Sequence, residues 1–196
     1  MNAKKRFRAY ITDKVSLRSS EWERIASALD CQSVKANNLV LSEGAVCRHL
    51  YFLDRGLLRF FQWIDGEDKT KFFTFEEQLF TAQQSYHTQQ PAQETIQALE
   101  DSTLLLIHRE QAQKLYQEVA TWPAFIQQVR LQVSGWTEEL LMESLNETAE
   151  QRYRRMLDEY PQRTQRIPLK HLASYLGIAP ESLSRIRKKI VDTDRT

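Results

Sequence analysis

The sequence predicts an α+β chain built, in order, from a β-sandwich or barrel, a long helix and a helix-turn-helix. Three observations support this class. Between Ser33 and about Ile107, short apolar runs rich in Val, Phe, Tyr, Leu and Thr alternate with Gly, Asn and Asp, a pattern typical of a sandwich or barrel. Beyond Ile107 the apolar residues recur every three or four positions, as they do in helices. Residues 169–190 then form two such stripes with a glycine between them.

Length and charge bound the kind of protein. The 196 residues have room for one large domain or two small ones. The net charge of +1 hides an asymmetry, because residues 152–196 contain eleven Lys and Arg against five Asp and Glu, whereas residues 1–151 contain sixteen against twenty-one. A basic C-terminal module on a mildly acidic body indicates that the C-terminal part meets a polyanion.

The sequence also predicts a cytoplasmic protein with no membrane partner. Positive residues near the N-terminus are not followed by the apolar core of a secretory signal. No stretch approaches the ~20 apolar residues that a membrane span needs. Cys31 and Cys47, the only cysteines, fit a reducing compartment and are too few for a four-cysteine iron–sulfur or zinc site. We expect buried or incidental thiols rather than a redox switch.

The first predicted elements are one helix and a series of strands. Residues 19–29 carry an N-terminal Ser, early Glu residues and one apolar face, as a short helix would. The turn signals are Asp54-Arg55-Gly56 and Asp65-Gly66-Glu67, and the second should close a hairpin. The apolar runs that we expect to form strands are LVL, HLYFL, LLRFFQWI, KTKFFTF, ETIQAL and TLLLI.

A long helix with an apolar seam follows the strands. HREQAQKLYQEV should link the β-domain to it, with Leu115 and Val119 turned inward. From Pro123 onward the seam is heptad-like, which favours pairing with a second copy of the chain. In a monomer the same stripe could pack on the chain's own core. The residues of the predicted dimer seam are Ile126, Val129, Val133, Trp136 and Leu140.

The next predicted helix, TAEQRYRRMLDEY, ends before Pro161. Asn146 and Glu147 separate it from the long helix. Its apolar side should enter a small C-terminal core, and Gln162–Pro168 should be a polar connection with Ile167 as its only apolar anchor. The residues expected in that core are Tyr153, Met156, Leu157 and Tyr160.

Residues 169–190, LKHLASYLGIAPESLSRIRKKI, predict a helix-turn-helix. Ala173 is small where the second helix should press on the first. Gly177 tolerates the positive φ of the turn without steric cost. Pro180 fits the first turn of the second helix, where an N–H is not needed. These small residues and the apolar spacing occur together, which a basic amphipathic helix alone would not explain.

The exposed face of the second helix has the chemistry of a DNA recognition surface. If Leu183, Ile186 and Ile190 face inward, the polar residues between them face solvent. On such a face Arg can pair bidentately with guanine, Glu can accept a hydrogen bond from cytosine, and Ser or Lys can bind phosphates. The alternative is a solvated basic face. The residues expected on this exposed side are Glu181, Ser182, Ser184, Arg185, Lys188 and Lys189.

In this order and at this length, the parts resemble the cyclic-AMP receptor and fumarate-nitrate regulator (Crp/Fnr) superfamily of transcription factors. The segments that carry the resemblance are HLYFLDRGLLRFF, ALEDSTLLLI and LASYLGIAPESLSRIRK. It implies a cyclic-nucleotide-binding-like jelly roll (1–120), a dimerisation helix (121–145) and a DNA-binding domain (146–196). It also implies double-stranded DNA and RNA polymerase as partners. By similarity, Glu181 and Arg185 occupy base-reading positions, Ser182 a phosphate-contacting one, and Lys170 lies near the DNA backbone.

Two departures from that family are visible. The sequence continues only six residues beyond Ile190, so we expect a reduced wing after the recognition helix. In the stretch FTAQQSYHTQQPAQETIQAL, Ala82 and Gln83 replace the Gly-Glu pair of cyclic-nucleotide-binding members, and Gln93 or Glu94 stands near the expected Arg. Because burying a cyclic phosphate without a paired cation is strongly unfavourable, we expect no response to cyclic AMP.

Three alternatives remain open for the sensor domain. An arginine from another strand, Arg48, Arg55 or Arg59, could supply the missing cation. A different, less anionic effector could bind near Phe80 to Gln97, or DNA binding could be constitutive.

Other function classes fit less well. A metal-dependent enzyme on a jelly roll needs clustered ligands, and the four histidines are scattered without an HxH or HExxH motif. We therefore expect no enzyme activity, no metal and no cofactor. The second alternative is a ligand-binding regulatory module that acts through protein–protein contacts of its C-terminal helices.

Overall fold

The computed structural model describes residues 3–193 and contains a sandwich of two antiparallel sheets. One sheet has the strand order β1-β8-β3-β6 and the other β2-β7-β4-β5. The strands of the described part are β1 (Asp30–Val34), β2 (Leu39–Leu41), β3 (His49–Arg55), β4 (Leu58–Ile64), β5 (Glu67–Thr74), β6 (Gln78–Phe80), β7 (Thr95–Ala98) and β8 (Ser102–His108).

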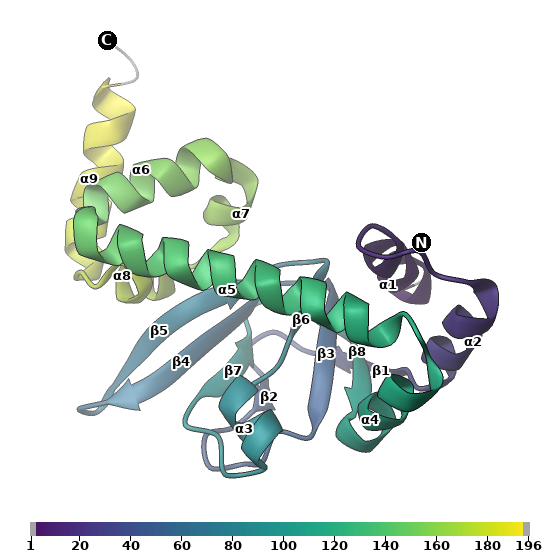
Figure 1. Ribbon diagram of the computed structural model, residues 1–196. Helices are drawn as coiled ribbons and strands as arrows, with labels where there is room; N and C mark the ends of the chain where they lie inside the picture. Colours follow the sequence, from purple (N-terminus) through teal and green to yellow (C-terminus); the bar gives the residue numbers. More distant parts are fainter. Residues whose placement is uncertain (1–2, 194–196) are drawn as a thin grey trace.

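Helices lie at both ends of the chain, and the long helix α5 crosses the sandwich between them (Figure 1). The helices of the described part are α1 (Ala3–Thr12), α2 (Ser19–Ser27), α3 (Gln83–Thr88), α4 (Arg109–Glu118), α5 (Trp122–Asn146), α6 (Ala149–Glu159), α7 (Pro161–Arg166), α8 (Leu169–Leu176) and α9 (Pro180–Thr193). The predicted fold class is confirmed. Each apolar run expected to form a strand overlaps one, with differences of one residue at some ends, whereas α1, α3, α7 and β1 are not among the predicted elements.

Three apolar cores explain why the central strands are apolar on both faces. The first core fills the sandwich and includes Tyr51, Phe60 and Leu104. The second lies between the outer face of β3 and β8 and the helices α1, α2, α4 and α5, with Phe52 among its members. The third holds α6, α8 and α9 together and also includes Leu57 of the β-domain. Because β3 and β8 are covered on both sides, their sequences read as continuous apolar runs instead of alternating ones.

Both predicted turns are present. Asp65 and Gly66 have φ of 53° and 80°, which suits a two-residue hairpin turn between β4 and β5. Gly56, between β3 and β4, has a φ of 110°, and a Cβ added there would lie 2.1 Å from Ser102 Oγ. Only glycine fits that turn without displacing β8.

The C-terminal helices differ from the expectation in two places. The segment expected to be a polar connection forms the short helix α7, which Pro161 begins in the first turn. Tyr160 is 51% exposed, so its assignment to the C-terminal core is wrong. It ends α6 in a non-helical conformation and points outward. Ile167 is buried as predicted.

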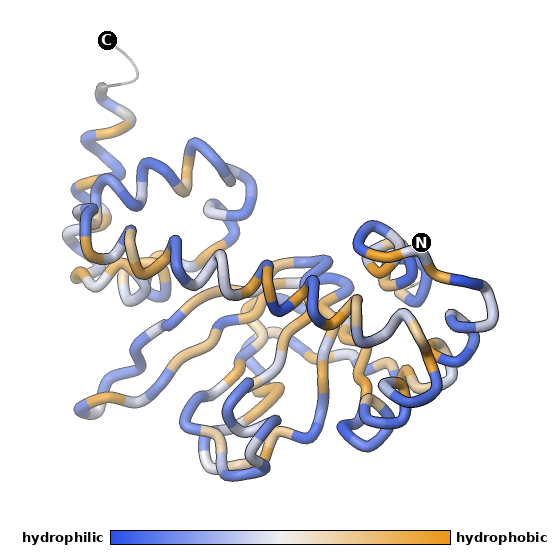
Figure 2. The backbone as a smooth tube through the Cα atoms, in the orientation of Figure 1, coloured by the Kyte–Doolittle hydropathy of each residue, from blue (hydrophilic) through white to orange (hydrophobic). Residues whose placement is uncertain are grey.

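Hydropathy follows this architecture. In Figure 2 hydrophobic residues run through the strands in the centre of the sandwich, whereas much of the β4–β5 hairpin, α6 and α7 is hydrophilic. Among the described residues, no helix combines the length and the apolar character that crossing a membrane would require.

Candidate nucleic-acid interface

The helix-turn-helix forms for the local reasons that its sequence indicates. Gly177 adopts a φ of 74° and ends α8, while Ile178 N–H donates to the Ala173 carbonyl at 3.1 Å. Ala173 is fully buried, as the close approach of α9 requires. Leu183 and Ile190 face the core of this module, and Ile186 is partly buried against it. The orientation of α9 is therefore fixed by its apolar side.

The opposite side of α9 is open to solvent. Glu181, Ser184, Arg185 and Lys188 are exposed, and Ser182 is half-buried. Neither a hydrogen bond nor an ion pair within the described residues occupies the side chain of Arg185 or Lys188. The structure thus brings these predicted contact residues together on one face, free to meet a ligand outside the chain.

Two basic residues of α9 have partners within the module. Lys189 Nζ lies 3.0 and 3.1 Å from the two carboxylate oxygens of Glu150 on α6. Its side chain is nevertheless 64% exposed. The hydrogen bonds from Lys189 and Arg154 lower the pKa of Glu150. Arg187, which was not among the predicted contacts, lies over the Tyr153 ring at 5.7 Å.

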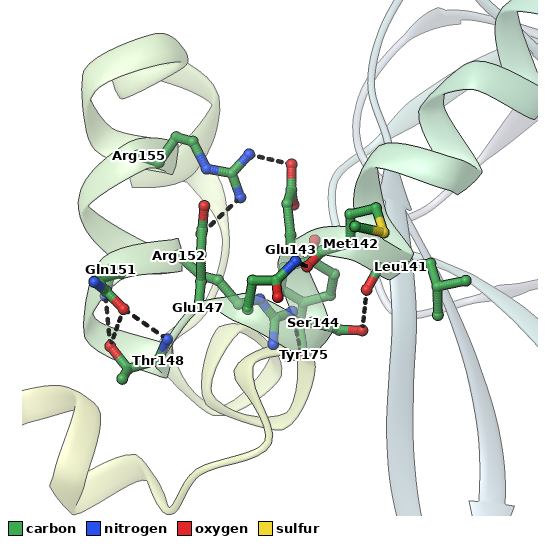
Figure 3. Close-up of polar contacts among 11 residues, drawn as sticks. Leu141, Met142, Glu143, Ser144, Glu147, Thr148, Gln151, Arg152, Arg155 and Tyr175 are labelled. Atoms are coloured by element: carbon green, nitrogen blue, oxygen red, sulfur yellow. Dashed lines mark hydrogen bonds and ion pairs between the residues drawn. The ribbon is translucent and has the colours of Figure 1, made fainter.

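The module is joined to α5 by a polar junction rather than by a free linker (Figure 3). Thr148 and Gln151 form a capping box at the start of α6. Arg155 pairs with Glu143 and, at 3.1 Å, with Glu147. These contacts hold α6 against the C-terminal end of α5, so movement of α5 would be passed to the C-terminal helices α6–α9.

The first helix of the motif, α8, packs on the β4–β5 hairpin of the β-domain. Ser174 Oγ donates to the Asp68 carbonyl at 3.0 Å and accepts from Thr70 N–H at 2.9 Å. The rings of Tyr175 and Phe73 lie 5.6 Å apart. Lys170 is exposed at the start of α8, close enough to Asp68 for its charge to act on that carboxylate. The predicted backbone contact therefore lies at the edge of this junction.

A buried arginine lies at the centre of the junction. Arg59, on the outer face of β4, is 2% exposed, and its Nη1 lies 2.7 Å from His171 Nδ1 on α8. Its Nη2 donates to Asp68 at 2.9 Å and to Gln97 at 3.1 Å. Burial, and then the charge of Arg59, lower the pKa of His171 to about 4. Burial alone would raise the pKa of Asp68, but the hydrogen bond and charge of Arg59 outweigh it and lower that pKa.

A second cluster joins the domains through Arg166, the last residue of α7. Arg166 donates to Glu76 at 2.6 and 3.0 Å and to Glu100 at 2.6 and 3.0 Å. It also donates to the Gly56 carbonyl at 3.1 Å. These hydrogen bonds raise the pKa of Arg166. The guanidinium thus joins α7 to three loops of the β-domain, those after β3, β5 and β7.

The predicted dimer seam is buried at one end and open at the other. Ile126 and Val129 are 9% and 7% exposed and pack in the chain's own core, with Val133 against it. Trp136 is 41% exposed and its ring meets Phe72 of β5 at 5.4 Å. The first part of this stripe packs on the β-domain, so Ile126 and Val129 expose little surface to a second chain. Dimer contact through the seam stays a prediction. Leu140 is half-buried.

The interior of the sandwich is occupied by aromatic rings. Tyr51 stacks on Phe80 at 5.1 Å, and Phe60 stacks on Phe72 at 4.2 Å. Phe60 and Phe80 meet edge to face at 5.8 Å. With Phe72 against Trp136, the rings continue from the sandwich to α5.

In the stretch that resembles a phosphate cassette, no Lys or Arg stands at the position of the family's phosphate-binding arginine. Glu94 is paired at 2.5 Å with Lys71 of β5, and Gln93 is exposed. Ala82 is buried, and Gln83 begins α3 on the surface. Of the three arginines that could have replaced the family's, Arg48 and Arg55 are exposed, and Arg59 points out of the sandwich toward α8.

Several residues of this interface were missed from the sequence. Arg59 and Arg166 join the C-terminal helices to the β-domain, whereas the sequence pattern indicates only a possible pocket cation for Arg59 and a polar connection for Arg166. The available signal was a lone arginine within the apolar run LLRFFQWI. Within residues 3–193, no three or more His, Cys, Asp or Glu side chains are gathered in a way that could hold a metal ion.

Comparison with known proteins finds one matching domain family and several solved structures of similar fold. Residues 31–119 match the cyclic nucleotide-binding domain family. No curated protein sequence matches the chain significantly. Among solved structures, FixK2 from Bradyrhizobium japonicum has a TM-score of 0.73 at 16% identity, over 85% of this chain and 86% of that one. The c-di-GMP-responsive global regulator CLP from Xanthomonas campestris has a TM-score of 0.72 at 15% identity, over 90% and 93%.

A further neighbour is described as a regulator of the Crp/Fnr family. It comes from Eubacterium rectale and has a TM-score of 0.68 at 19% identity, over 90% of this chain and 85% of that one. Identities this low show likeness of fold, and the likeness includes α5 and the C-terminal helices as well as the sandwich. Residues 31–119 therefore match the cyclic nucleotide-binding domain family, and the chain as a whole is similar in fold to these three solved regulators.

Proposed function

We propose that the protein is a sequence-specific regulator of transcription that binds double-stranded DNA as a homodimer in the cytoplasm. The observation that carries the proposal is the exposed face of α9. Arg185, Lys188, Ser184 and Glu181 project from a helix whose other side is fixed in a core. A helix of this kind enters the major groove, where Arg and Glu read base edges and Lys holds phosphates. RNA polymerase is the further partner that such a regulator requires.

For the dimer, we propose contact through the solvent-facing side of α5, because the start of the predicted seam packs in the chain's own core. Four large apolar side chains are exposed there, and spacings of 3, 4 and 14 residues put them on one helical face. Their exposed fractions are Leu131 59%, Leu141 58%, Met142 55% and Leu145 70%. A stripe of this kind on a long helix suits pairing with a second copy.

The dimer has its own test. Leu145→Asp should give monomers in sedimentation velocity, because a carboxylate would have to be buried in the helix pair. Glu138→Asp, on the same helix, keeps the charge pattern and should leave the dimer intact. A wild-type protein that sediments as a monomer at micromolar concentration would refute the dimer.

The DNA-binding proposal is tested by selection from a random DNA library with the purified protein. We expect an imperfect palindrome whose half-sites lie about one helical turn, ~34 Å, apart. Arg185→Ala should cost roughly 1–3 kcal/mol and relax preference at one base position. Lys188→Ala should weaken binding to all DNA sequences alike and reduce the slope of log affinity against log salt concentration by about one unit.

Arg187→Ala provides a matched control on the same helix. Its guanidinium lies on Tyr153 within the module, so its loss should leave the base preference unchanged. Failure to enrich any sequence, with binding independent of salt, would favour the protein–protein module instead.

We further propose that cyclic AMP is not the effector. A carboxylate, Glu94, stands near the position of the family's phosphate-binding arginine, and the nearest cation, Lys71, is already paired with it. Aromatic rings occupy the interior of the sandwich. A buried cyclic phosphate would lack the paired cation that offsets its desolvation.

Calorimetric titration tests this reading. Cyclic AMP, cyclic GMP and cyclic di-GMP should be titrated separately, the last because the Xanthomonas neighbour responds to it. No heat with cyclic AMP up to millimolar concentration is the expected result. Micromolar binding of cyclic AMP that also tightens DNA affinity would refute it. The variant Glu94→Gln, in which Lys71 loses its carboxylate partner, should be titrated in parallel. If this variant binds cyclic AMP, the Glu94 carboxylate is what prevents binding in the wild-type protein.

A further inference from the structure

Arg59 is an unusual residue for its position. It lies in the apolar strand β4 and is almost fully buried, although a charged side chain is costly to bury without partners. Its partners come from two neighbouring strands and one helix: Thr70 and Asp68 on β5, Gln97 on β7, and His171 on α8. Only His171 belongs to the DNA-binding module. Arg59 therefore links the β-domain to the first helix of the recognition motif.

The Arg59–His171 contact constrains the protonation of the histidine. A guanidinium can only donate, so Nδ1 of His171 must be an unprotonated acceptor, and the ring proton must be on Nε2. A protonated imidazole would place a second positive charge 2.7 Å from Nη1 and would lose the hydrogen bond. The contact can exist only while His171 is neutral.

Three charged groups of the described residues act on His171. Arg59 comes from β4, Asp68 from β5, and Lys170 from α8 itself. The two cations and burial oppose protonation, and Asp68 favours it. Beside this group, the only polar support of α8 on the hairpin within the described residues is Ser174, through Thr70 and Asp68.

We propose that Arg59 is a positioning residue for DNA recognition: through neutral His171 it fixes α8, and with it α9, on the β-domain, and protonation of His171 releases this hold. The inference rests on the proposed DNA-binding function. Its physical basis is preorganisation, because two recognition helices reach two half-sites together only if each is held at a set place relative to α5. After release, each recognition helix can still bind one half-site, but the dimer binds the two half-sites of a palindrome together less tightly.

The size of the effect follows from linkage. In the released module His171 has its ordinary pKa of about 6.5, and in the docked module about 4. Docking is then at full strength above pH 6.5 and weakens as the pH falls toward 4. Between pH 7.5 and 5.5 the docking equilibrium constant should fall about tenfold.

The first test measures docking without DNA. The amide of Thr70 donates to Ser174 Oγ across the junction, so its hydrogen-exchange protection reports on docking. After correction for intrinsic exchange rates, that protection should fall about tenfold between pH 7.5 and 5.5 in the full-length wild-type protein. His171→Asn, whose side-chain oxygen can accept from Arg59 but does not titrate, should remove this dependence. His87→Asn, a surface histidine on α3, should retain it.

The second test measures DNA affinity. The ratio of palindrome affinity to half-site affinity should fall over the same pH range in the wild-type protein and stay constant in His171→Asn. Arg59→Lys should lower the ratio at every pH, because an ammonium cannot replace the planar fork that donates to Asp68, Gln97 and His171 together. Far-ultraviolet circular dichroism identifies any variant that fails to fold, and His171→Asn then carries the test alone.

The outcomes are distinguishable. A Thr70 protection that does not change with pH, or that changes equally in His171→Asn, overturns the positioning role whatever the DNA results are. A pH-dependent protection with no specific DNA binding at any pH overturns the proposed function and the role in recognition. A pH-dependent protection together with a pH-dependent palindrome ratio supports both.

Discussion

Replacing Arg166 with Ala tests how strongly the two domains hold each other. The guanidinium donates five hydrogen bonds to Glu76, Glu100 and the Gly56 carbonyl, all on the β-domain. Its removal leaves two carboxylates facing each other without a cation. The substitution therefore removes the attraction and adds a repulsion.

The magnitude is limited by solvent. The side chains of Arg166, Glu76 and Glu100 are 31%, 32% and 35% exposed, so the 3–5 kcal/mol typical of breaking a fully buried pair is too high. Isolated surface pairs contribute about 0–1 kcal/mol. For several charge-assisted bonds in this half-buried site we expect a loss of about 2–3 kcal/mol. In a protein of this size that lowers Tm by roughly 4–12 °C.

The assay is thermal and urea unfolding at pH 7 and at pH 4. Burial tends to raise the pKa of Glu76, but the Arg166 hydrogen bond and charge outweigh it and lower that pKa. The contribution is therefore present above pH 4.5 and lost as the pH falls through the folded-state pKa, so the two proteins should converge in acid. Arg163→Ala is the matched control, because Arg163 lies over the Phe75 ring at 5.2 Å and forms no ion pair with any described residue. Equal Tm losses in the two variants would refute the reasoning.

Three further outcomes are expected. Gly56→Ala should cost roughly 3 kcal/mol or more in urea unfolding, because its φ of 110° and a Cβ 2.1 Å from Ser102 Oγ both oppose a side chain; a loss below 1 kcal/mol would contradict this. Glu150→Gln removes a carboxylate that pairs with Lys189 and should therefore steepen the salt dependence of random-DNA binding, measured by fluorescence anisotropy. A thiol reagent should react rapidly with exposed Cys31 in the native protein, and with a second thiol only after unfolding.

The sequence by itself determined the elements whose causes are local. The Asp65-Gly66 turn and the Gly177 helix end have positive φ values that these residue types accept, and they appear where the sequence indicates them. The apolar spacing of 169–190 fixed which side of α9 is exposed, and hence the candidate recognition face. Such features depend on residues a few positions apart, which a single sequence contains in full.

Only the tertiary structure decided which partner each face and charge would meet. The stripe from Ile126 to Trp136 could face a second chain or the chain's own core, and the helical period is the same for both. Arg59 could point into the sandwich or away from it, and it points away, to a histidine 112 residues later in the chain. Lys189 meets Glu150, 39 residues earlier. Contacts between distant residues are selected by the packing of the whole chain, for which local periodicity carries no signal.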